Sequence, residues 1–269
     1  MITSHQSLIQ AEFTKQGANF ATAPSIVDPS RIARLVAASN PKPTDRVVEF
    51  ATGPGHVALG FAPHVKEIVG VDITEALLEI ANRSKTDRGI TNASFITGNV
   101  ESPTGLSSLP SASFDIAVCR LAFHHFQNPA QALREMSRLV KPVTGRVVVQ
   151  DVHGSGVDGG KRRDFQDEWE TLRDPSHTKF LTLPELTTAF GECGLEVEVI
   201  QTDDVIQKVD RWFQTTQTPP ESRAKVLEML ERDMKEDLSG ARPYYSDVDG
   251  EKTMFFTHRM VTIVGRRIR

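Results

Sequence analysis

Residues 45–62 constrain the fold of this chain more than any other segment. An apolar run over 45–50 predicts a strand, the turn Ala51-Thr52-Gly53-Pro54-Gly55 follows, and a helical pattern covers 55–62. Glycine lets the backbone of such a turn approach a ligand closely, because no Cβ stands in the way. A strand, a glycine-rich turn and a helix in this order bring backbone N–H groups to the carboxyl edge of a sheet, where nucleotide-like ligands bind.

Strands and helices alternate over the first half of the chain. Apolar runs predict strands at 45–50, 67–72, 93–98, 114–120 and 146–152, with helices near 55–62, 74–84 and 129–140 between them. Strands separated by helices pair in parallel through right-handed crossovers. We therefore expect an α/β protein with a doubly wound, mostly parallel sheet, and two further strands are predicted at 195–200 and 255–265.

The remaining segments are expected to cover this sheet. We expect one domain over 1–269, with a helical N-terminal lid over 1–40 and cap segments over 153–182 and 206–254. The second cap contains a helical pattern near 218–238, which Thr218-Pro219-Pro220-Glu221 would open as a capping box.

Composition excludes several classes of protein. The chain has 269 residues and a formal net charge of -4, which argues against a dedicated nucleic-acid binder. It contains no apolar run long enough to span a membrane and no secretion-signal core, and it has only two cysteines, Cys119 and Cys193. We expect a cytoplasmic protein that acts on a small molecule and that could form a homo-oligomer.

Two acidic residues bear on the ligand. Gly53-Pro54-Gly55-His56-Val57-Ala58 fits the G-x-G-x-x-A pattern of dinucleotide sites, and Asp72 ends the second strand, where a carboxylate can bind ribose hydroxyls. Glu49 ends the first strand, where a carboxylate would repel a pyrophosphate but favour the cationic sulfonium and ammonium of S-adenosylmethionine. The acids therefore favour S-adenosylmethionine over NAD(P).

Several motifs in residues 10–200 resemble the class I S-adenosylmethionine-dependent methyltransferases, in particular their UbiE-like, type 11 group. They are the glycine turn, Val69-Gly70-Val71-Asp72, Gly98-Asn99, Ala122-Phe123-His124-His125-Phe126 and Arg134-Glu135-Met136-Ser137-Arg138-Leu139-Val140-Lys141-Pro142. The resemblance implies a seven-stranded sheet with an antiparallel last strand. The chain departs from the family pattern at Ala51, where a first glycine is usual, and at Asn99, where an aspartate is common. Alanine at position 51 is tolerable if its φ is negative.

The resemblance and the strand ends together give the candidate site. The candidate cofactor-binding residues are Phe20, Glu49, Ala51, Thr52, Gly53, Gly55, Asp72, Ile73, Asn99, Val100 and Arg120. Methyl transfer is an in-line displacement that needs a base only if the acceptor carries a proton. The candidate bases are His125, His124 and His177; Asp151 and His153 are too few for a metal site.

Two other functions stay open at this point. An NAD(P)-dependent oxidoreductase fits the glycine pattern, although Glu49 argues against it. A non-catalytic S-adenosylmethionine-binding protein also fits, because methyl transfer need not leave a catalytic residue to identify.

Overall fold

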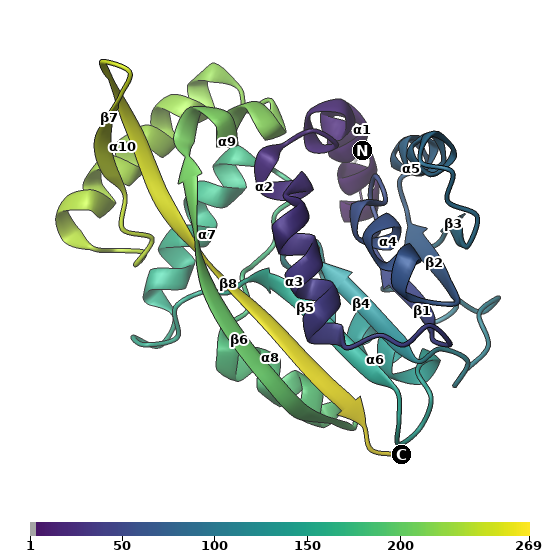
Figure 1. Cartoon of the computed structure of the whole chain (residues 1–269). Coiled ribbons are helices and arrows are strands. Elements are labelled where there is room, and N and C mark those ends of the chain that lie inside the picture. The colour runs from purple at the N-terminus through teal and green to yellow at the C-terminus, as the bar shows by residue number, and fades with distance from the viewer. Residues whose placement is uncertain (1–3) are drawn as a thin grey trace.

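One eight-stranded sheet runs through the computed structural model, which describes residues 4–269 (Figure 1). Strands β1 to β5 are parallel in the order β3-β2-β1-β4-β5, and β8 lies antiparallel between β5 and β6. This confirms the predicted doubly wound sheet with an antiparallel last strand. The strands are β1 (Arg46–Phe50), β2 (Glu67–Asp72), β3 (Ala93–Thr97), β4 (Ile116–Arg120), β5 (Arg146–Val152), β6 (Leu195–Lys208), β7 (Tyr244–Val248) and β8 (Glu251–Arg267).

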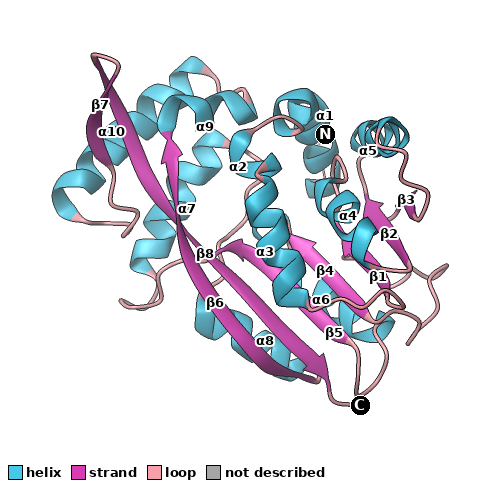
Figure 2. Ribbon diagram, in the orientation of Figure 1, coloured by secondary structure: helices cyan, strands magenta, loops and turns pink. Residues whose placement is uncertain are grey.

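Helices cover both faces of the parallel part of the sheet (Figure 2). Helices α3 (Pro29–Ser39) and α4 (His56–Phe61) bury Leu35 and Leu59 on one face. Helices α6 (Pro129–Leu139) and α8 (Leu183–Glu192) bury Met136 and Phe190 on the other. Because both faces are covered, β1, β4 and β5 are almost entirely buried, which explains why they read as continuous apolar runs in the sequence.

Helix α5 (Glu75–Asp87) follows β2 and packs against β2 and β3. The other helices lie toward the carboxyl edge of the parallel strands, and α1 (His5–Phe20) with the short α2 (Pro24–Val27) precedes the sheet. Helices α7 (Lys161–Arg173), α9 (Val209–Thr216) and α10 (Pro220–Glu236) pack around Trp169. They pack there with the far half of β8, which is its N-terminal part and carries Met254 and Phe256. Two 3-10 turns, η1 (Ala62–His64) and η2 (Phe123–His125), complete the described elements.

The outer strands differ from the prediction. The sheet has one more strand than the seven expected, because β7 forms a hairpin with the first residues of β8. The strand predicted at 195–200 continues to Lys208 and pairs with β8 along its whole length, from Leu195 with Arg267 to Lys208 with Phe255. Most residues of this extension are exposed, so the sequence lacks the apolar alternation that predicts a strand.

The predicted capping box of α10 is also wrong. Pro219 is the N-cap and makes no side-chain capping bond, while the Thr218 hydroxyl pairs with that of Thr216 at 2.7 Å and donates to the Arg173 carbonyl at 3.2 Å. The buried Thr218 therefore joins α9 to the end of α7. A complete capping box occurs instead at the start of α8, between Thr182 and Glu185.

Candidate functional site

The glycine turn leaves β1 at the carboxyl edge of the sheet and is fixed by hydrogen bonds to β2. The Thr52 amide donates to the Val71 carbonyl at 2.9 Å, and the Gly53 amide donates to Asp72 Oδ2 at 2.8 Å. Gly55 has a φ of 82°, and a Cβ there would lie 2.9 Å from the Ala81 side chain. Ala51 does not have the negative φ that would make alanine readily tolerable at this position, because its φ is 52°. This alanine is held in the left-handed region that glycine adopts without strain.

Glu49 stabilises this turn through hydrogen bonds to its carboxyl group. Its Oε2 accepts hydrogen bonds from the Thr52 hydroxyl at 2.5 Å and from the Ala58 amide of α4 at 2.8 Å. Burial raises the pKa of Glu49 to about 8, although these two hydrogen bonds and the Arg120 charge act in the opposite direction. The Glu49 carboxyl group thus links the end of β1 to α4, and Glu49 also lines the adjacent pocket.

Asp72 and Asn99 stand at the ends of the next two strands. The two Asp72 oxygens each accept one backbone hydrogen bond at 2.8 Å, Oδ2 from Gly53 and Oδ1 from Thr74. Asn99 Oδ1 accepts from the Glu101 amide at 2.9 Å. A carboxylate oxygen and an amide oxygen can each accept a second hydrogen bond, so both groups retain capacity for a ligand.

These groups line a pocket with about 890 Å³ of empty space, counted out to its mouth. Ten of the eleven candidate cofactor residues contribute to its wall: Phe20, Glu49, Ala51, Thr52, Gly53, Asp72, Ile73, Asn99, Val100 and Arg120. Gly55 is the exception, because it packs against Ala81 and Phe95 behind the turn. Gln6, Ile9 and Phe13 of α1 also line this pocket; no motif in α1 identifies them individually.

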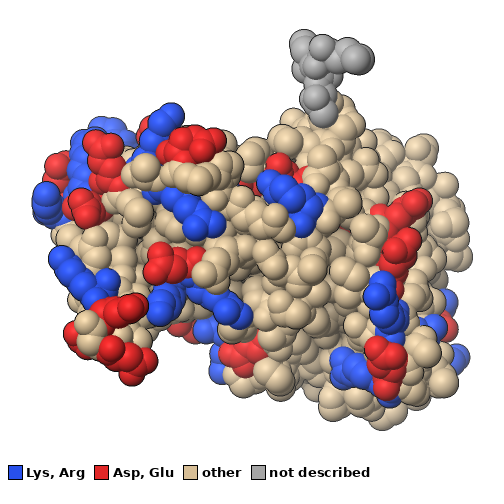
Figure 3. Space-filling model, turned by 90° about the horizontal axis from the view of Figure 1, so that it is seen from above, with Lys and Arg blue, Asp and Glu red and all other residues tan. Residues whose placement is uncertain are grey.

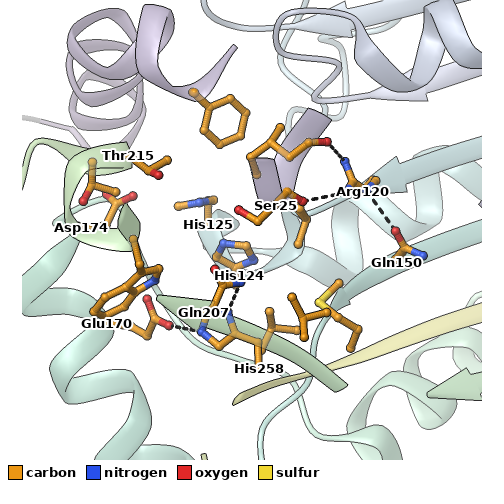
Figure 4. Close-up of a pocket in the computed structure, with 18 of the residues that line it drawn as sticks. Ser25, Arg120, His124, His125, Gln150, Glu170, Asp174, Gln207, Thr215 and His258 are labelled. Carbon is orange, nitrogen blue, oxygen red and sulfur yellow. Dashed lines mark hydrogen bonds and ion pairs between the residues drawn. The ribbon is translucent and has the colours of Figure 1, made fainter. Parts of the chain in front are cut away.

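A second pocket, of about 910 Å³ counted in the same way, adjoins the first. Six residues line both: Phe13, Phe20, Ile26, Arg120, Leu121 and His125. The second pocket extends from them toward α7, α9 and the far half of β8 (Figure 4). The two cavities are therefore neighbouring compartments at the carboxyl edge of the sheet.

Arg120 joins the sheet to the segment that covers both pockets. Its Nε donates to Gln150 Oε1 at 3.0 Å, and its two terminal nitrogens donate to the carbonyls of Ile26 at 2.9 Å and Ser25 at 3.3 Å (Figure 4). Burial lowers the pKa of Arg120 to about 10, so it is cationic at neutral pH. It fixes α2 above the junction of the pockets.

His124 is paired with a buried carboxylate. His124 Nδ1 lies 2.6 Å from Asp151 Oδ1, and Asp151 is 2% exposed. Burial alone would lower the pKa of His124, but the Asp151 charge and hydrogen bond raise it above its usual value. Because the carboxylate holds the Nδ1 proton, Nε2 is the nitrogen left to exchange a proton with a ligand in the second pocket.

The pKa of the neighbouring His125 is shifted in the opposite direction. Burial and the adjacent His124 lower its pKa to about 3, so the ring is neutral. Its Nδ1 lies 3.1 Å from both the carbonyl and the hydroxyl of Ser176. A carbonyl only accepts, so Nδ1 carries the proton and Nε2 is a hydrogen-bond acceptor.

The other histidines are placed differently. His177 lies behind His124, with ring centroids 5.7 Å apart, and its Nε2 contacts Asp167 at 2.8 Å; it lines neither pocket. His153 also lines neither. Among residues 4–269, no group of three His, Cys, Asp or Glu side chains is arranged to hold a metal ion.

Another buried network, which was not predicted from the sequence, lies in the second pocket. His258 Nε2 lies 2.7 Å from Glu170 Oε1, and Arg173 contacts the other Glu170 oxygen at 3.3 Å. Burial would raise the pKa of Glu170, but His258 and Arg173 lower it to about 2. These residues come from α7 and β8, which carry no motif, so only the folded topology brings them to the site.

This fold and these adjoining pockets define a Rossmann-like methyltransferase, and the comparisons with known proteins agree. Residues 26–200 match the family model described as a methyltransferase domain. The chain therefore belongs to the class I methyltransferase family, and its cofactor is S-adenosylmethionine.

Individual relatives support the same assignment. The chain is 32% identical over 185 residues to the uncharacterized methyltransferase YcgJ of Bacillus subtilis, covering 69% of this chain and 70% of that one. The YcgJ crystal structure superposes with a TM-score of 0.78 at 27% identity, over 88% of this chain and 97% of the other. A proposed methyltransferase of Bacillus halodurans gives a TM-score of 0.79 at 25% identity, over 89% and 100%.

One relative that matches a shorter segment of the chain is named for a different activity. The S-adenosyl-L-methionine-dependent Diels-Alderase iccD of Talaromyces variabilis is 32% identical over 107 residues, covering 40% of this chain and 36% of that one.

No helix within residues 4–269 is both long and apolar enough to cross a bilayer.

Proposed function

We propose that this protein methylates a small molecule that binds in the second pocket and carries a proton on its nucleophilic atom. The observation that carries the proposal is the junction of the two pockets, where Arg120, Leu121 and His125 line both. A cofactor in the first pocket would present its methyl group there. Holding the two reactants in line across such a junction supplies much of the rate of a displacement reaction.

In the proposed reaction the acceptor atom attacks the methyl carbon as the carbon–sulfur bond breaks. The bonding electron pair stays on sulfur, which gives neutral S-adenosylhomocysteine, and the acceptor proton passes to His124 Nε2. The His124–Asp151 pair supports this assignment, because a carboxylate that fixes one imidazole nitrogen leaves the other as the base. His125, with a pKa of about 3, serves better as a neutral hydrogen-bond acceptor. We assign His177 only a supporting position behind His124.

The cofactor contacts follow from the strand ends. We assign Asp72 to the ribose hydroxyls and Asn99, with Ile73 and Val100, to the adenine side of the pocket. Glu49 with Ala51, Thr52 and Gly53 would face the methionine portion, and Phe20 would cover the cofactor from α1. In this assignment Gly55 acts through the shape of the turn.

The surroundings of the second pocket favour a small acceptor over a macromolecule. Residues from α1, α2, α7 and α9 line the cavity, so it is walled by several segments. Acidic and basic side chains are interspersed on the face seen in Figure 3, which shows no extended basic surface of the kind that binds nucleic acid.

Binding of the cofactor to the purified protein is the first test. Calorimetry with S-adenosylmethionine, S-adenosylhomocysteine and NAD(H) should detect the first two and not the third. A screen of phenols, amines and quinol-like acceptors with methyl-labelled cofactor should then transfer label to at least one compound. Tight NAD(H) binding without a response to the other two ligands would refute the proposal.

The relative named as a Diels-Alderase gives a second function to be tested, in which the cofactor binds but its methyl group stays in place. The distinguishing measurement is release of S-adenosylhomocysteine. Conversion of an acceptor without that release would show that the cofactor is not a methyl donor here.

A further inference from the structure

Asp174 is a buried carboxylate in the wall of the second pocket with half of its hydrogen-bonding capacity unused. The side chain belongs to a residue that is 3% exposed, and its Oδ1 accepts from the Ser176 amide at 3.0 Å and the Ser176 hydroxyl at 2.6 Å. Within residues 4–269, Oδ2 contacts no hydrogen-bond donor and no cation. This oxygen is not among the fully buried unpaired polar atoms, so it is open to the pocket, where a ligand that donates to it would form a charge-assisted hydrogen bond.

The charge on Asp174 is present at neutral pH. Burial alone would raise its pKa, but the Arg173 charge and the Ser176 hydrogen bonds act in the opposite direction, and the pKa lies below the usual value. The nearby Arg173 is itself engaged, because it contacts Glu170 at 3.3 Å and stacks over the Trp212 ring at 4.5 Å. Asp174 is therefore a carboxylate without a dedicated cation.

The other cations of the same pocket are also occupied. Arg31 pairs with Asp28 at 3.2 Å, and Arg34 lies 3.8 Å from Asp203. Arg120 donates to backbone carbonyls, and in Figure 4 it lies on the opposite side of the cavity from Asp174, with His125 between them. No cation among these faces the free oxygen of Asp174 through a direct contact.

Gln16 offers a second unused acceptor in the same cavity. Its Nε2 donates to Glu12 Oε2 at 3.2 Å. A carboxylate only accepts, so this contact fixes the amide orientation and leaves Oε1 as the free atom. Gln16 is 1% exposed and lines the second pocket, and no described donor contacts Oε1.

Aromatic rings also line the pocket that contains these acceptors. Phe13, Phe180 and Trp212 line the same pocket. A buried carboxylate together with aromatic faces is the combination that binds organic ammonium groups, because the ring quadrupole also attracts a cation. Hydroxyl donors alone would not use the negative charge.

We propose that the methyl acceptor carries a protonated amine, and that Asp174 Oδ2, assisted by Gln16 Oε1, binds its ammonium group. The inference rests on the proposed function and adds the chemical class of the acceptor. The ammonium is an anchor that orients the acceptor, and the nucleophilic atom lies elsewhere on the molecule, toward His124 and the junction of the pockets.

Three probes with the same phenol ring and different side-chain charge test this proposal. Tyramine is cationic, 4-ethylphenol is neutral and 3-(4-hydroxyphenyl)propionate is anionic. Each is titrated into the full-length protein saturated with S-adenosylhomocysteine, and binding is followed by calorimetry or ligand-observed NMR. Tyramine should bind roughly tenfold or more tightly than either of the others, as expected for one charge-assisted hydrogen bond in a buried site.

The variant Asp174→Asn tests the residue. Asparagine keeps an oxygen for the two Ser176 donors but replaces Oδ2 by an NH2 group, which donates. The tyramine preference should disappear, while the affinity for S-adenosylhomocysteine and the melting temperature stay close to those of the wild type. Gln16→Met, which removes the second acceptor together with the Nε2 donor to Glu12, should reduce tyramine binding by a smaller factor.

Asp203→Asn is the matched control. Asp203 lines the same pocket, but its side chain is 48% exposed and faces Arg34, so the tyramine preference should persist. Equal or weaker binding of tyramine than of the other probes, or an unchanged preference in Asp174→Asn, would overturn the inference. The wild-type titration with S-adenosylhomocysteine separates this outcome from a failure of the proposed function, because a protein that does not bind the cofactor product fails at that earlier step.

Discussion

The pairing of His124 with Asp151 makes a residue-scale prediction about proton affinity. The carboxylate raises the pKa of His124 above 6.5, while burial lowers that of His125 to about 3. In an NMR titration of the imidazole signals, His124 should titrate above pH 6.5 and His125 should not titrate between pH 5 and 9. In Asp151→Asn the titration of His124 should move below pH 6.5, because burial then dominates.

The same shift fixes the pH dependence of the reaction. A base must be neutral to accept a proton, so kcat/KM for a protic acceptor should rise as pH increases through the raised pKa of His124. Loss of Asp151 should move this rising limb to lower pH and reduce kcat. An unmoved limb in Asp151→Asn would assign the base to another group.

Asp72 carries a second residue-scale prediction. It holds the Gly53 and Thr74 amides and also lines the cofactor pocket. Asp72→Ala should weaken S-adenosylhomocysteine binding by about 100-fold, since both the ligand contact and the support of the turn are lost. Asp115→Asn is a suitable control, because Asp115 contacts the Arg46 amide and Lys141 and lines neither pocket. Near wild-type calorimetric affinity in Asp72→Ala would argue against the ribose assignment.

The residues of the site differ in how far the sequence could predict them. Glu49, Asp72 and Asn99 follow apolar runs, so their positions at the sheet edge come directly from the order of strands. Glu170, Asp174 and His258 come from segments without a motif, and they meet only through the long β6–β8 pairing and the packing of α7. Alanine at position 51 was expected to need a negative φ, although the glycine that is usual there in the family is the residue that adopts a positive φ without strain.

At the scale of elements, α1 and α2 depend on a few directional contacts. Arg120 binds the α2 carbonyls, His56 Nε2 lies 3.0 Å from the Ala21 carbonyl, and Asn19 donates to the Gln214 carbonyl of α9 at 3.0 Å. Only Gln16 and Gly17 of α1 are buried. A cover with so little buried surface is expected to open locally at low free energy.

Arg120→Lys should loosen this cover. An ammonium cannot reach the Gln150 side chain and two backbone carbonyls in the planar geometry of a guanidinium. Hydrogen exchange of residues 21–27 should become faster without cofactor, and S-adenosylhomocysteine affinity should fall by about tenfold. The control Arg34→Lys alters a side chain that is 60% exposed, and it should change neither quantity. Lost affinity with unchanged exchange would indicate a direct ligand contact instead.

Prediction of elements from the sequence was most accurate where tertiary packing matched local pattern. The parallel strands and the helices α4, α5 and α6 lie within a few residues of their predicted ranges, because both faces of that sheet are apolar. The sequence does not predict the C-terminal half of β6 or any of β7, because most of their residues are exposed. Backbone pairing with β8 stabilises both segments instead.

At the scale of the whole molecule, the buried side chains fall into separate clusters. Two clusters pack on the faces of the parallel sheet and contain Phe50 and Phe61. A third contains Trp169, Trp212 and Phe256 and belongs to α7, α9, α10 and the far half of β8. We propose that this third cluster, formed largely by the cap segments 153–182 and 206–254, is a packing unit that shapes the acceptor pocket while the sheet shapes the cofactor pocket.

Trp169→Ala tests this division of the molecule. Trp169 is 0% exposed at the centre of the third cluster, and truncating such a side chain costs roughly 3–5 kcal/mol of folding free energy. In urea denaturation the cap should unfold at a lower concentration than the sheet, and binding of acceptor-site ligands should be lost. S-adenosylhomocysteine affinity should fall only a few-fold.

Phe50→Ala removes a comparable side chain beneath the glycine turn and should instead weaken S-adenosylhomocysteine binding strongly. Because the two clusters share the long strand β8 rather than a common core, equal losses in both variants would mean that the sheet and the cap fold as one cooperative unit.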